Sequence, residues 1–253
     1  TSQSGGAAPP AHGGAQAAGP GERGLLVVFG ASGGTGLALV QLALEEGYAV
    51  RAVVRSWSTL ERELPEDLVG HALLEVVEAD LADLPAISDA LAGGVRAAIS
   101  VAGAKPETAP GPMTEAVPAM VEGCRLHGVR KLIVQACALA AAPGERVGWL
   151  TQASLVRTVV RWQLRSTIVD DNERVMQFLS REVDDLDWVV SRPAGLEDGD
   201  SRGSLVPSLD PFRTATVRYC DVAAWTLAQV EGEAYVRKMP RLYYARAAAE
   251  HPI

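Results

Sequence analysis

Short runs of apolar residues recur along the chain from Gly24 to Tyr244, and the stretches between them carry apolar residues at helical spacing. Continuous apolar runs of this length are typical of parallel strands that are buried on both faces of a sheet. We expect strands at residues 24–30, 48–54, 73–77, 95–101, 129–136, 186–190 and 241–244. We expect helices near residues 37–46, from a capping box at Ser58–Glu61, and at 85–91, 114–126, 170–180 and 221–230. This alternation predicts an α/β fold: a single Rossmann-like, doubly wound parallel sheet with helices on both faces.

The first 23 residues, TSQSGGAAPPAHGGAQAAGPGER, differ from the rest because they contain no large apolar side chain. Such a segment cannot bury enough surface to offset the entropy lost on ordering. We expect residues 1–23 to form a tail that is flexible or held by a partner protein. One domain at residues 24–247 and a short C-terminal tail at residues 248–253 complete the expected organisation. The chain begins at Thr1 rather than Met, which fits either a removed targeting peptide or a trimmed end.

The balance of charge argues against nucleic acid as a partner. Lys and Arg number 23 and Asp and Glu number 31, giving a net charge of −8, whereas nucleic-acid-binding surfaces are usually basic. No stretch of the sequence approaches the ~18 consecutive apolar residues of a membrane span. The three cysteines are odd in number and far apart, so neither a disulfide framework nor a zinc site is expected.

The four histidines stand alone in the sequence, without a neighbouring histidine or a cluster of carboxylates, and we therefore expect no metal. Together these features predict a soluble protein of a reducing compartment. That compartment is the cytoplasm or, after removal of a targeting peptide, the plastid stroma or the mitochondrial matrix.

The first expected strand runs directly into Gly30-Ala31-Ser32-Gly33-Gly34-Thr35-Gly36, here called the glycine loop. The pattern G-x-x-G-x-x-G between a strand and a helix is typical of a dinucleotide-binding turn. Gly30 permits the tight turn, Gly33 lets the backbone approach a pyrophosphate, and Gly36 lets the helix lie close to the strand. The helix N-terminus offers N–H groups and partial positive charge to the phosphates. Ser32 and Thr35 are expected to line this phosphate site.

Residues Gly30–Gly34 also fit G-x-S-x-G, the nucleophile elbow of serine hydrolases. That mechanism would need an acid and then a histidine further along the chain. His127 lies just before the fifth expected strand and His251 in the last three residues, so neither is well placed to activate Ser32. The dinucleotide interpretation is favoured, and a glycine-rich turn without a ligand is the other alternative.

The residue after the second expected strand bears on the choice of cofactor. An acidic residue there would bind the ribose hydroxyls and repel a 2′-phosphate, but the chain has Arg55, whose planar fork of donors can pair with a phosphate. We therefore expect NADP(H) rather than NAD(H), the alternative being a solvated arginine at a strand end. Asp80 and Leu81 are placed to meet the adenine, although Asp80 could equally cap a helix. Ala102 and Gly103 let the chain pass close to the middle of the cofactor.

These motifs, with others further along the chain, resemble the atypical short-chain dehydrogenase/reductase family, and within it the NmrA-like proteins and the biliverdin-IXβ/flavin reductases. The segments that carry the resemblance are VVFGASGGTG, YAVRAVVRS, VVEADLAD, HGVRKLIVQA, TIVDDNERVMQFL, LDWVVSRPAGLEDG and DVAAWTLAQV. The resemblance implies an NADP-binding Rossmann domain with the nicotinamide near the ends of the fourth and fifth strands. It also implies that Pro193, Ala194 and Gly195 pass near the nicotinamide. The cofactor-binding roles of the glycine loop, Arg55, Asp80, Leu81, Ala102 and Gly103 are carried over with it.

The chain departs from the family where many members place their acid/base pair. No tyrosine is followed four residues later by a lysine, so the Tyr-x-x-x-Lys pair is missing. Where the fifth strand commonly ends in a serine, this chain has Cys137, which is either a thiol on the substrate side or a small buried residue that only packs. The acidic residues at 170–173 are interpreted as a charge cluster at a helix start rather than as catalytic acids.

Two functions are compatible with these residues. The first is an NADPH-dependent reductase that passes hydride to a flavin, a quinone or a tetrapyrrole, since a conjugated acceptor can take its proton from solvent. In this case Trp149 and Trp162 could form a stacking lid, or they could simply pack a connecting helix. The second is a non-catalytic NADP(H)-binding sensor or accessory subunit of a larger complex, which the missing acid/base pair favours.

Overall fold

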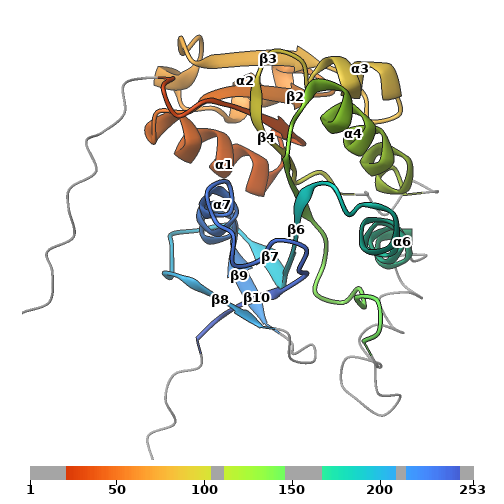
Figure 1. The fold of residues 1–253 in the computed structure, drawn as a ribbon. Helices are drawn as coiled ribbons and strands as arrows, with labels where there is room; N and C mark the ends of the chain where they lie inside the picture. Colours follow the sequence, from red (N-terminus) through yellow and green to blue (C-terminus); the bar gives the residue numbers. More distant parts are fainter. Residues whose placement is uncertain (1–20, 104–110, 146–166, 209–214, 246–253) are drawn as a thin grey trace, which may run out of the picture.

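The computed structural model describes residues 21–103, 111–145, 167–208 and 215–245 of the 253-residue chain. In these residues eight strands form one sheet, and helices lie on both sides of it (Figure 1). Its strands, in spatial order, are β3 (Leu74–Glu78), β2 (Ala49–Val54), β1 (Leu25–Phe29), β4 (Val95–Ser100), β5 (Lys131–Gln135), β6 (Asp187–Pro193), β10 (Arg241–Tyr244) and β8 (Leu205–Ser208). The α-helices are α1 (Gly34–Glu45), α2 (Trp57–Glu63), α3 (Leu84–Asp89), α4 (Met113–His127), α6 (Thr167–Glu182) and α7 (Tyr219–Ala228).

The strand order 3-2-1-4-5-6 is that of a doubly wound Rossmann sheet. Neighbouring strands from β3 through β10 are parallel, and β8 pairs antiparallel with β10 at the edge. The expected fold class is thus confirmed. Strand β1 pairs with β2 on one side and with β4 on the other. The order in which strands are added to the sheet therefore reverses between β1 and β4. In sheets of this kind ligands bind beyond the carboxyl ends of the strands at such a switch point.

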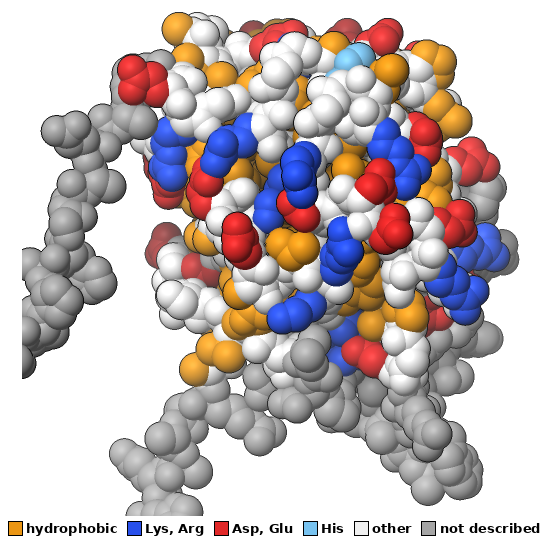
Figure 2. Space-filling model, in the orientation of Figure 1, with side chains coloured by type: hydrophobic (Ala, Val, Ile, Leu, Met, Phe, Trp, Pro, Cys, Tyr) orange, Lys and Arg blue, Asp and Glu red, His pale blue; other side chains and the backbone are white. Residues whose placement is uncertain are grey.

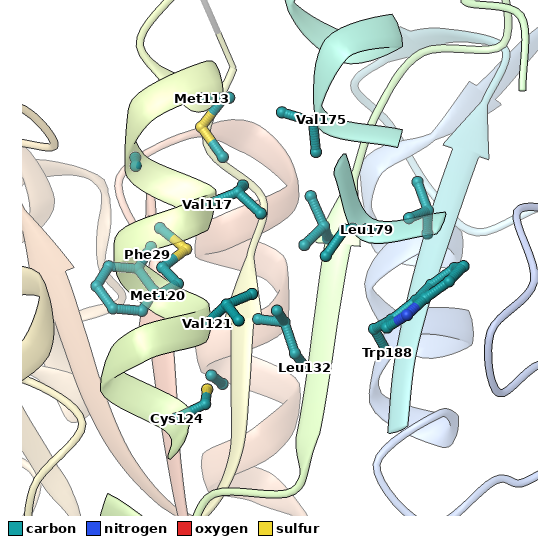
Figure 3. Close-up of a cluster of buried hydrophobic side chains, with 14 of the residues drawn as sticks. Phe29, Met113, Val117, Met120, Val121, Cys124, Leu132, Val175, Leu179 and Trp188 are labelled. Atoms are coloured by element: carbon teal, nitrogen blue, oxygen red, sulfur yellow. The ribbon is translucent and has the colours of Figure 1, made fainter. Parts of the chain in front are cut away.

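Both faces of the sheet are buried, which is why its strands have continuous apolar sequences. Val27 and Phe29 of β1 point to the face covered by α3, α4 and α6, whereas Leu26 and Val28 point to the face covered by α1 and α7. Figure 3 shows the first of these cores, in which Phe29 from the sheet meets Met120 of α4. Because the sheet is held by packing on both sides, the loops at its edge have a rigid base.

A second, two-stranded sheet joins β7 (Gly195–Glu197) to β9 (Thr216–Arg218) in parallel register. It packs through Val217 against Val222 of α7 and Leu242 of β10 in a small separate apolar cluster. This sheet follows β6 directly and leads directly into α7, so it fixes where α7 begins.

The structure corrects the expected start of one helix and adds elements that the sequence did not indicate. The expected capping box at Ser58–Glu61 is wrong, because α2 begins at Trp57 with Ser56 as its N-cap residue. The carboxylate of Glu78 accepts a hydrogen bond from the Trp57 N–H instead. The short strands β7, β8 and β9 were not expected, because runs of three or four residues carry no periodicity that stands out from a loop.

The end of the expected tail is part of the folded protein. The N–H of Gly21 donates to the carbonyl of Gly47, and Arg23 pairs with Glu46 at 2.7 Å while lying over the ring of Tyr48. Residues 1–20, which make up the rest of the expected tail, lie outside the described residues, as does the expected C-terminal tail at 248–253.

The surface carries charges of both signs. Figure 2 shows Lys and Arg side chains interspersed with Asp and Glu side chains on the face in view, rather than gathered into an area of one sign. Among the helices of the described residues, none is long and apolar enough to cross a membrane.

Candidate functional site

The residues expected to bind a cofactor lie at one edge of the sheet. The glycine loop follows β1, Arg55 follows β2, Asp80 follows β3 and Ala102 follows β4. Because these strands are parallel, their carboxyl ends meet at the same edge. The structure thus brings together residues that are far apart in the sequence, at the switch point between β1 and β4.

Gly30 makes a turn that another residue could not make without strain. Its φ is +81°, in the left-handed region that favours glycine. A Cβ on Gly30 would lie 2.7 Å from the backbone N and Cα of Ala102, which runs past it from the end of β4. Ala102 therefore supports the glycine loop, and the next residue, Gly103, has open space around it.

Gly36 brings α1 against the end of β1. A Cβ there would lie 2.8 Å from the Cα of Ala31 and closer still to the carbonyl oxygen of Gly30. Gly33 differs, since its Cβ would meet only that same oxygen, at an ordinary 3.4 Å, and would otherwise face open space. Neighbouring backbone thus requires glycine at Gly30 and Gly36, and Gly33 leaves the front of the loop open. The approach of a pyrophosphate to Gly33 stays a prediction.

The N-terminus of α1 presents three consecutive donors. Gly33 is the N-cap residue, with no side-chain cap, and the first bond of the helix runs from the Leu37 N–H to the Gly33 carbonyl. In the part of the chain that the structure describes, the N–H groups of Gly34, Thr35 and Gly36 have no acceptor. Uncapped N–H groups at a helix start carry a partial positive charge and bind anions.

Thr35 adds a buried hydroxyl at the same place. Its side chain is 3% exposed, and its Oγ1 has no hydrogen-bond partner in the described residues. Ser100, Ser191 and Thr226 also have buried hydroxyls without a partner among the described residues, so the Thr35 hydroxyl does not by itself mark a ligand site. The tight turn at Gly30, the open front of the loop at Gly33 and the uncapped start of α1 together fit the diphosphate of a dinucleotide.

Three charged residues stand at the ends of β2 and β3, where the adenosine is expected to bind. Arg55 is exposed after β2 and makes no hydrogen bond or ion pair to any described residue. The carboxylate of Glu78 is held by the Trp57 N–H, and Asp80 accepts a hydrogen bond from the Ala82 N–H at 2.9 Å. The helix-capping alternative for Asp80 is not realised, because Asp83 caps α3 by accepting from the Ala86 N–H. Leu81 packs half-buried against the core.

The other end of the site is formed by the ends of β5 and β6. The Ala138 N–H donates to the Pro193 carbonyl at 3.0 Å, which ties the segment after β5 to the end of β6. Ala194 is buried, and its N–H bonds to Leu242 of β10. Pro193 and Ala194 therefore lie at the edge where the resemblance expects the nicotinamide, next to the turn that holds Cys137.

Cys137 is fixed by a residue of α6. Its N–H donates to Asn172 Oδ1 at 2.7 Å, and the next residue of the helix, Glu173, accepts from the Ala141 N–H at 2.9 Å. Burial raises the pKa of the Cys137 thiol, which therefore stays protonated at neutral pH. A protonated, buried thiol is a poor nucleophile, so this residue suits packing or contact rather than covalent chemistry.

One acidic residue at the start of α6, Asp171, caps another helix rather than only adding charge to a cluster. Asp171 is 2% exposed and accepts hydrogen bonds from the N–H groups of Met113 and Thr114 and from the Thr114 hydroxyl. It thereby caps α4 from a different helix. The cap also occupies space, because a side chain on Gly111 would collide with this carboxylate.

The sequence analysis missed a buried ion-pair network beside the site. Arg192 of β6 is fully buried and reaches Glu145 at 2.7 Å, while Arg241 of β10 reaches the other oxygen of the same carboxylate at 2.7 Å. Each arginine also donates from Nε to a backbone carbonyl, Arg192 to Met239 and Arg241 to Ala138. Burial raises the pKa of Glu145, but the hydrogen bonds and charges of both arginines outweigh burial and hold this pKa below its ordinary value.

The network holds the segment after β5 in place. Arg192 Nη1 donates to the carbonyl of Ala140, and Glu145 Oε2 accepts from the N–H of Ala142. The expected lid residues Trp149 and Trp162 come next in the chain and lie outside the described residues. Nothing local marks Glu145 as the partner of two arginines, so only a three-dimensional contact map could have found it.

Among the described residues, no histidine is placed to activate Ser32 as the serine-hydrolase alternative requires, and His251 lies outside them. His71 and His127 come before β3 and β5, respectively, and therefore lie at the opposite edge of the sheet from Ser32. Lys131 and Lys238 are at that opposite edge as well, where they donate to the carbonyls of Gly232 and Ala234. Within residues 21–103, 111–145, 167–208 and 215–245, no group of three or more potential metal ligands occurs.

Comparison with known proteins identifies the cofactor class. A family model described as NAD(P)H-binding matches residues 30–233, which include the glycine loop and all the strands from β2 to β9. No curated protein matches the chain in sequence. The match confirms the expected NAD(P)-binding domain, and a pyridine nucleotide is therefore the cofactor.

Solved structures share the fold. The anaerobilin reductase ChuY of Escherichia coli is 21% identical, covers 89% of this chain and 99% of its own, and has a TM-score of 0.70. The oxidoreductase ylbE of Lactococcus lactis is 15% identical, with coverages of 88% and 92% and a TM-score of 0.69. A short-chain dehydrogenase/reductase of Veillonella parvula, solved in complex with NADP, is 15% identical, with coverages of 88% and 95% and a TM-score of 0.64. At these identities the likeness establishes the Rossmann fold.

Proposed function

The chain belongs to the family of NAD(P)H-binding domains, and we propose that it is an NADPH-dependent reductase that passes hydride to a conjugated acceptor. The observation that carries the proposal is the start of α1, where three N–H groups in a row lack an acceptor among the described residues. An anionic diphosphate there would satisfy these groups and interact favourably with the helix dipole. The fit is supported by the backbone of Ala102, which packs against Gly30 and holds the turn, and by the open space in front of Gly33.

Arg55 supports NADPH over NADH. It lies at the carboxyl end of β2, beside the predicted adenosine ribose, and it is free of any ion pair in the described residues. A guanidinium can form two parallel hydrogen bonds to a phosphate, which a ribose hydroxyl cannot match. The neighbouring Glu78 accepts the Trp57 N–H through Oε1 alone, and its second carboxylate oxygen can still accept from a ribose hydroxyl, so the preference for NADPH rests on Arg55.

The choice of acceptor follows from the groups around the predicted nicotinamide. When bound, the reduced nicotinamide supplies the hydride. The described residues that directly follow β4, β5 and β6 include no lysine, tyrosine or histidine that could deliver a proton, and burial raises the pKa of the Cys137 thiol. Lys105, which follows β4 in the sequence, lies outside the described residues. Reduction of a simple ketone needs a positioned proton donor. A flavin, a quinone or a tetrapyrrole spreads the incoming charge and takes its proton from solvent, so holding the two ring systems together is sufficient.

The same shortage of acid/base groups favours a second candidate function. In that case the chain binds NADP(H) without turning it over, as a sensor or as an accessory subunit of a larger complex. The two candidates share the cofactor site and differ only in whether an acceptor reaches the nicotinamide.

Loss of the nicotinamide absorbance of NADPH, measured with FMN, a quinone and biliverdin in turn, tests the proposal. The reductase predicts saturable consumption with at least one of the three acceptors. Consumption should be faster with NADPH than with NADH at low cofactor concentration. The Gly33→Ala variant is the matched control: it is expected to fold yet to bind cofactor poorly, and it measures the uncatalysed background. Tight NADPH binding without turnover of any acceptor would contradict the reductase and support the non-catalytic candidate.

A further inference from the structure

Gly34 stands at one of the variable positions of the glycine motif, and the structure shows why this chain needs glycine there. A Cβ on Gly34 would lie 2.6 Å from Cε2 and 2.7 Å from Cδ2 and Cζ of Tyr219. Real Cβ atoms essentially never approach other atoms this closely. The edge of the Tyr219 ring is therefore in contact with the first residue of α1.

Tyr219 is delivered to this position by the packing of two helices. It is the first residue of α7, which runs alongside α1 (Figure 1). The start of α7 is anchored by Asp221, which is 6% exposed and accepts hydrogen bonds from Ser201 Oγ, the Arg202 N–H and the Tyr244 hydroxyl. Burial raises the pKa of Asp221, but these hydrogen bonds outweigh it and hold the pKa below its ordinary value, so the anchor is ionised at neutral pH.

The Tyr219 ring carries its hydroxyl beside the predicted phosphate site, and this hydroxyl has no hydrogen-bond partner among the described residues. It is carried by Cζ, one of the three ring atoms in contact with the Gly34 position. The side chain is half-buried, and its hydroxyl makes no hydrogen bond to any described residue. Tyr48 and Tyr244 are different, because their hydroxyls bond to Glu231 and Asp221, respectively.

We propose that Tyr219 is a cofactor-binding residue, whose ring closes the glycine loop on the α7 side and whose hydroxyl donates a hydrogen bond to the cofactor diphosphate. This assignment rests on the proposed function. The free N–H groups of Gly34 and Thr35 fix where a phosphate oxygen would lie, and the Tyr219 ring is in contact with the same residue, Gly34. A phenol that approaches from the side gives the phosphate a donor that the helix start alone does not supply.

Titration of the Tyr219→Phe variant tests the hydroxyl, because this change keeps the ring. The dissociation constant for NADPH should rise about tenfold or more, since hydrogen bonds to charged groups contribute about 1.5–3 kcal/mol. Binding of 2′-AMP, which has the 2′-phosphate but no diphosphate, should change less than twofold. The matched control is Tyr235→Phe, whose ring packs on Trp225 near the opposite edge of the sheet, and it should bind both compounds like wild type.

A second comparison tests the ring contact independently of any ligand. Gly34→Ala should lower Tm in the wild-type background, because the new methyl meets the Tyr219 ring. The same change made in a Tyr219→Ala background should cost much less, because the colliding ring is gone. An equal loss in both backgrounds would show that the ring does not lie on Gly34 and would overturn the assignment.

The outcomes separate this assignment from the function on which it rests. A wild-type protein that binds neither NADPH nor NADH overturns both. A wild-type protein that binds NADPH while Tyr219→Phe binds it equally well overturns only the role of Tyr219. A loss that is as large for 2′-AMP as for NADPH would place the hydroxyl away from the diphosphate and would also overturn the assignment.

Discussion

The variants Gly33→Ala and Gly36→Ala should distinguish residues of the glycine loop that bind the cofactor from those that the fold requires. The two glycines are three residues apart, and the change in each is a single methyl group. At Gly36 that methyl would press on the backbone of Gly30 and Ala31, and backbone at a strand end cannot rotate away. At Gly33 it would meet only one carbonyl oxygen, at 3.4 Å.

The expected magnitudes differ accordingly. Overpacking against fixed backbone costs about 3 kcal/mol, so Gly36→Ala should lower Tm by roughly 6–12 °C in a protein of this size. Gly33 has φ −82° and ψ 163°, which alanine adopts without strain, and Gly33→Ala should change Tm by no more than about 2 °C. The new methyl, however, projects into the space predicted for the diphosphate. Losing one or two charge-assisted hydrogen bonds there should weaken NADPH binding about 10–100-fold.

Thermal unfolding of both variants and calorimetric titration with NADPH provide the two readouts. Gly33→Ala should keep the Tm of the wild type and bind NADPH more weakly, whereas the main effect of Gly36→Ala should be a lower Tm. If Gly33→Ala bound NADPH as tightly as wild type does, the front of the glycine loop would not face the diphosphate, and the reasoning about this site would be refuted.

Three other changes test separate parts of the account. Arg55→Glu should weaken NADPH at least tenfold more than NADH in parallel titrations, and equal effects would remove Arg55 from the phosphate site. Glu145→Gln should destabilise by about 3 kcal/mol at neutral pH, because Arg192 and Arg241 lose their shared charge partner. Folding lowers the pKa of Glu145 below its ordinary value of 4.5. The stabilisation that ionised Glu145 gives to the folded protein is therefore present above pH 4.5 and is lost as the pH falls through the lowered pKa. The Tm difference from wild type should therefore shrink in acid, and a difference independent of pH would contradict the ion pair. Asp171→Ala should lower Tm by roughly 3–6 °C through loss of the α4 cap, and an unchanged Tm would show that α4 is capped otherwise.

The parts of the fold that were predictable are those in which local sequence dictates structure. The strand at Leu25–Phe29 is apolar at every position because both of its faces are buried, and Gly36 after it is required by the backbone of Gly30 and Ala31 in the same loop. The helix expected at 85–91 forms as α3 for the same reason, because Asp83 caps a backbone N–H only three residues away. For Gly36 and Asp83 the interaction partner is a near neighbour in the chain.

The parts that were missed depend on partners far away in the sequence. Tyr219 has no local feature that connects it to Gly34, and the contact arises only because α7 returns to lie beside α1. Glu145 stands in an otherwise unremarkable turn until β6 and β10 place two arginines around it. The misplaced capping box has the same cause, because Glu78 from the neighbouring strand β3 caps α2 in place of a residue of the helix itself.

Calorimetric titration of the wild-type chain with NADPH and with NADH tests the central claim most directly, with thermal unfolding measured in the presence of each. The account predicts one saturable site, a higher Tm with either bound nucleotide, and tighter binding of NADPH than of NADH. Absence of both heat and thermal shift with the two nucleotides would contradict the claim that the start of α1 binds a dinucleotide diphosphate.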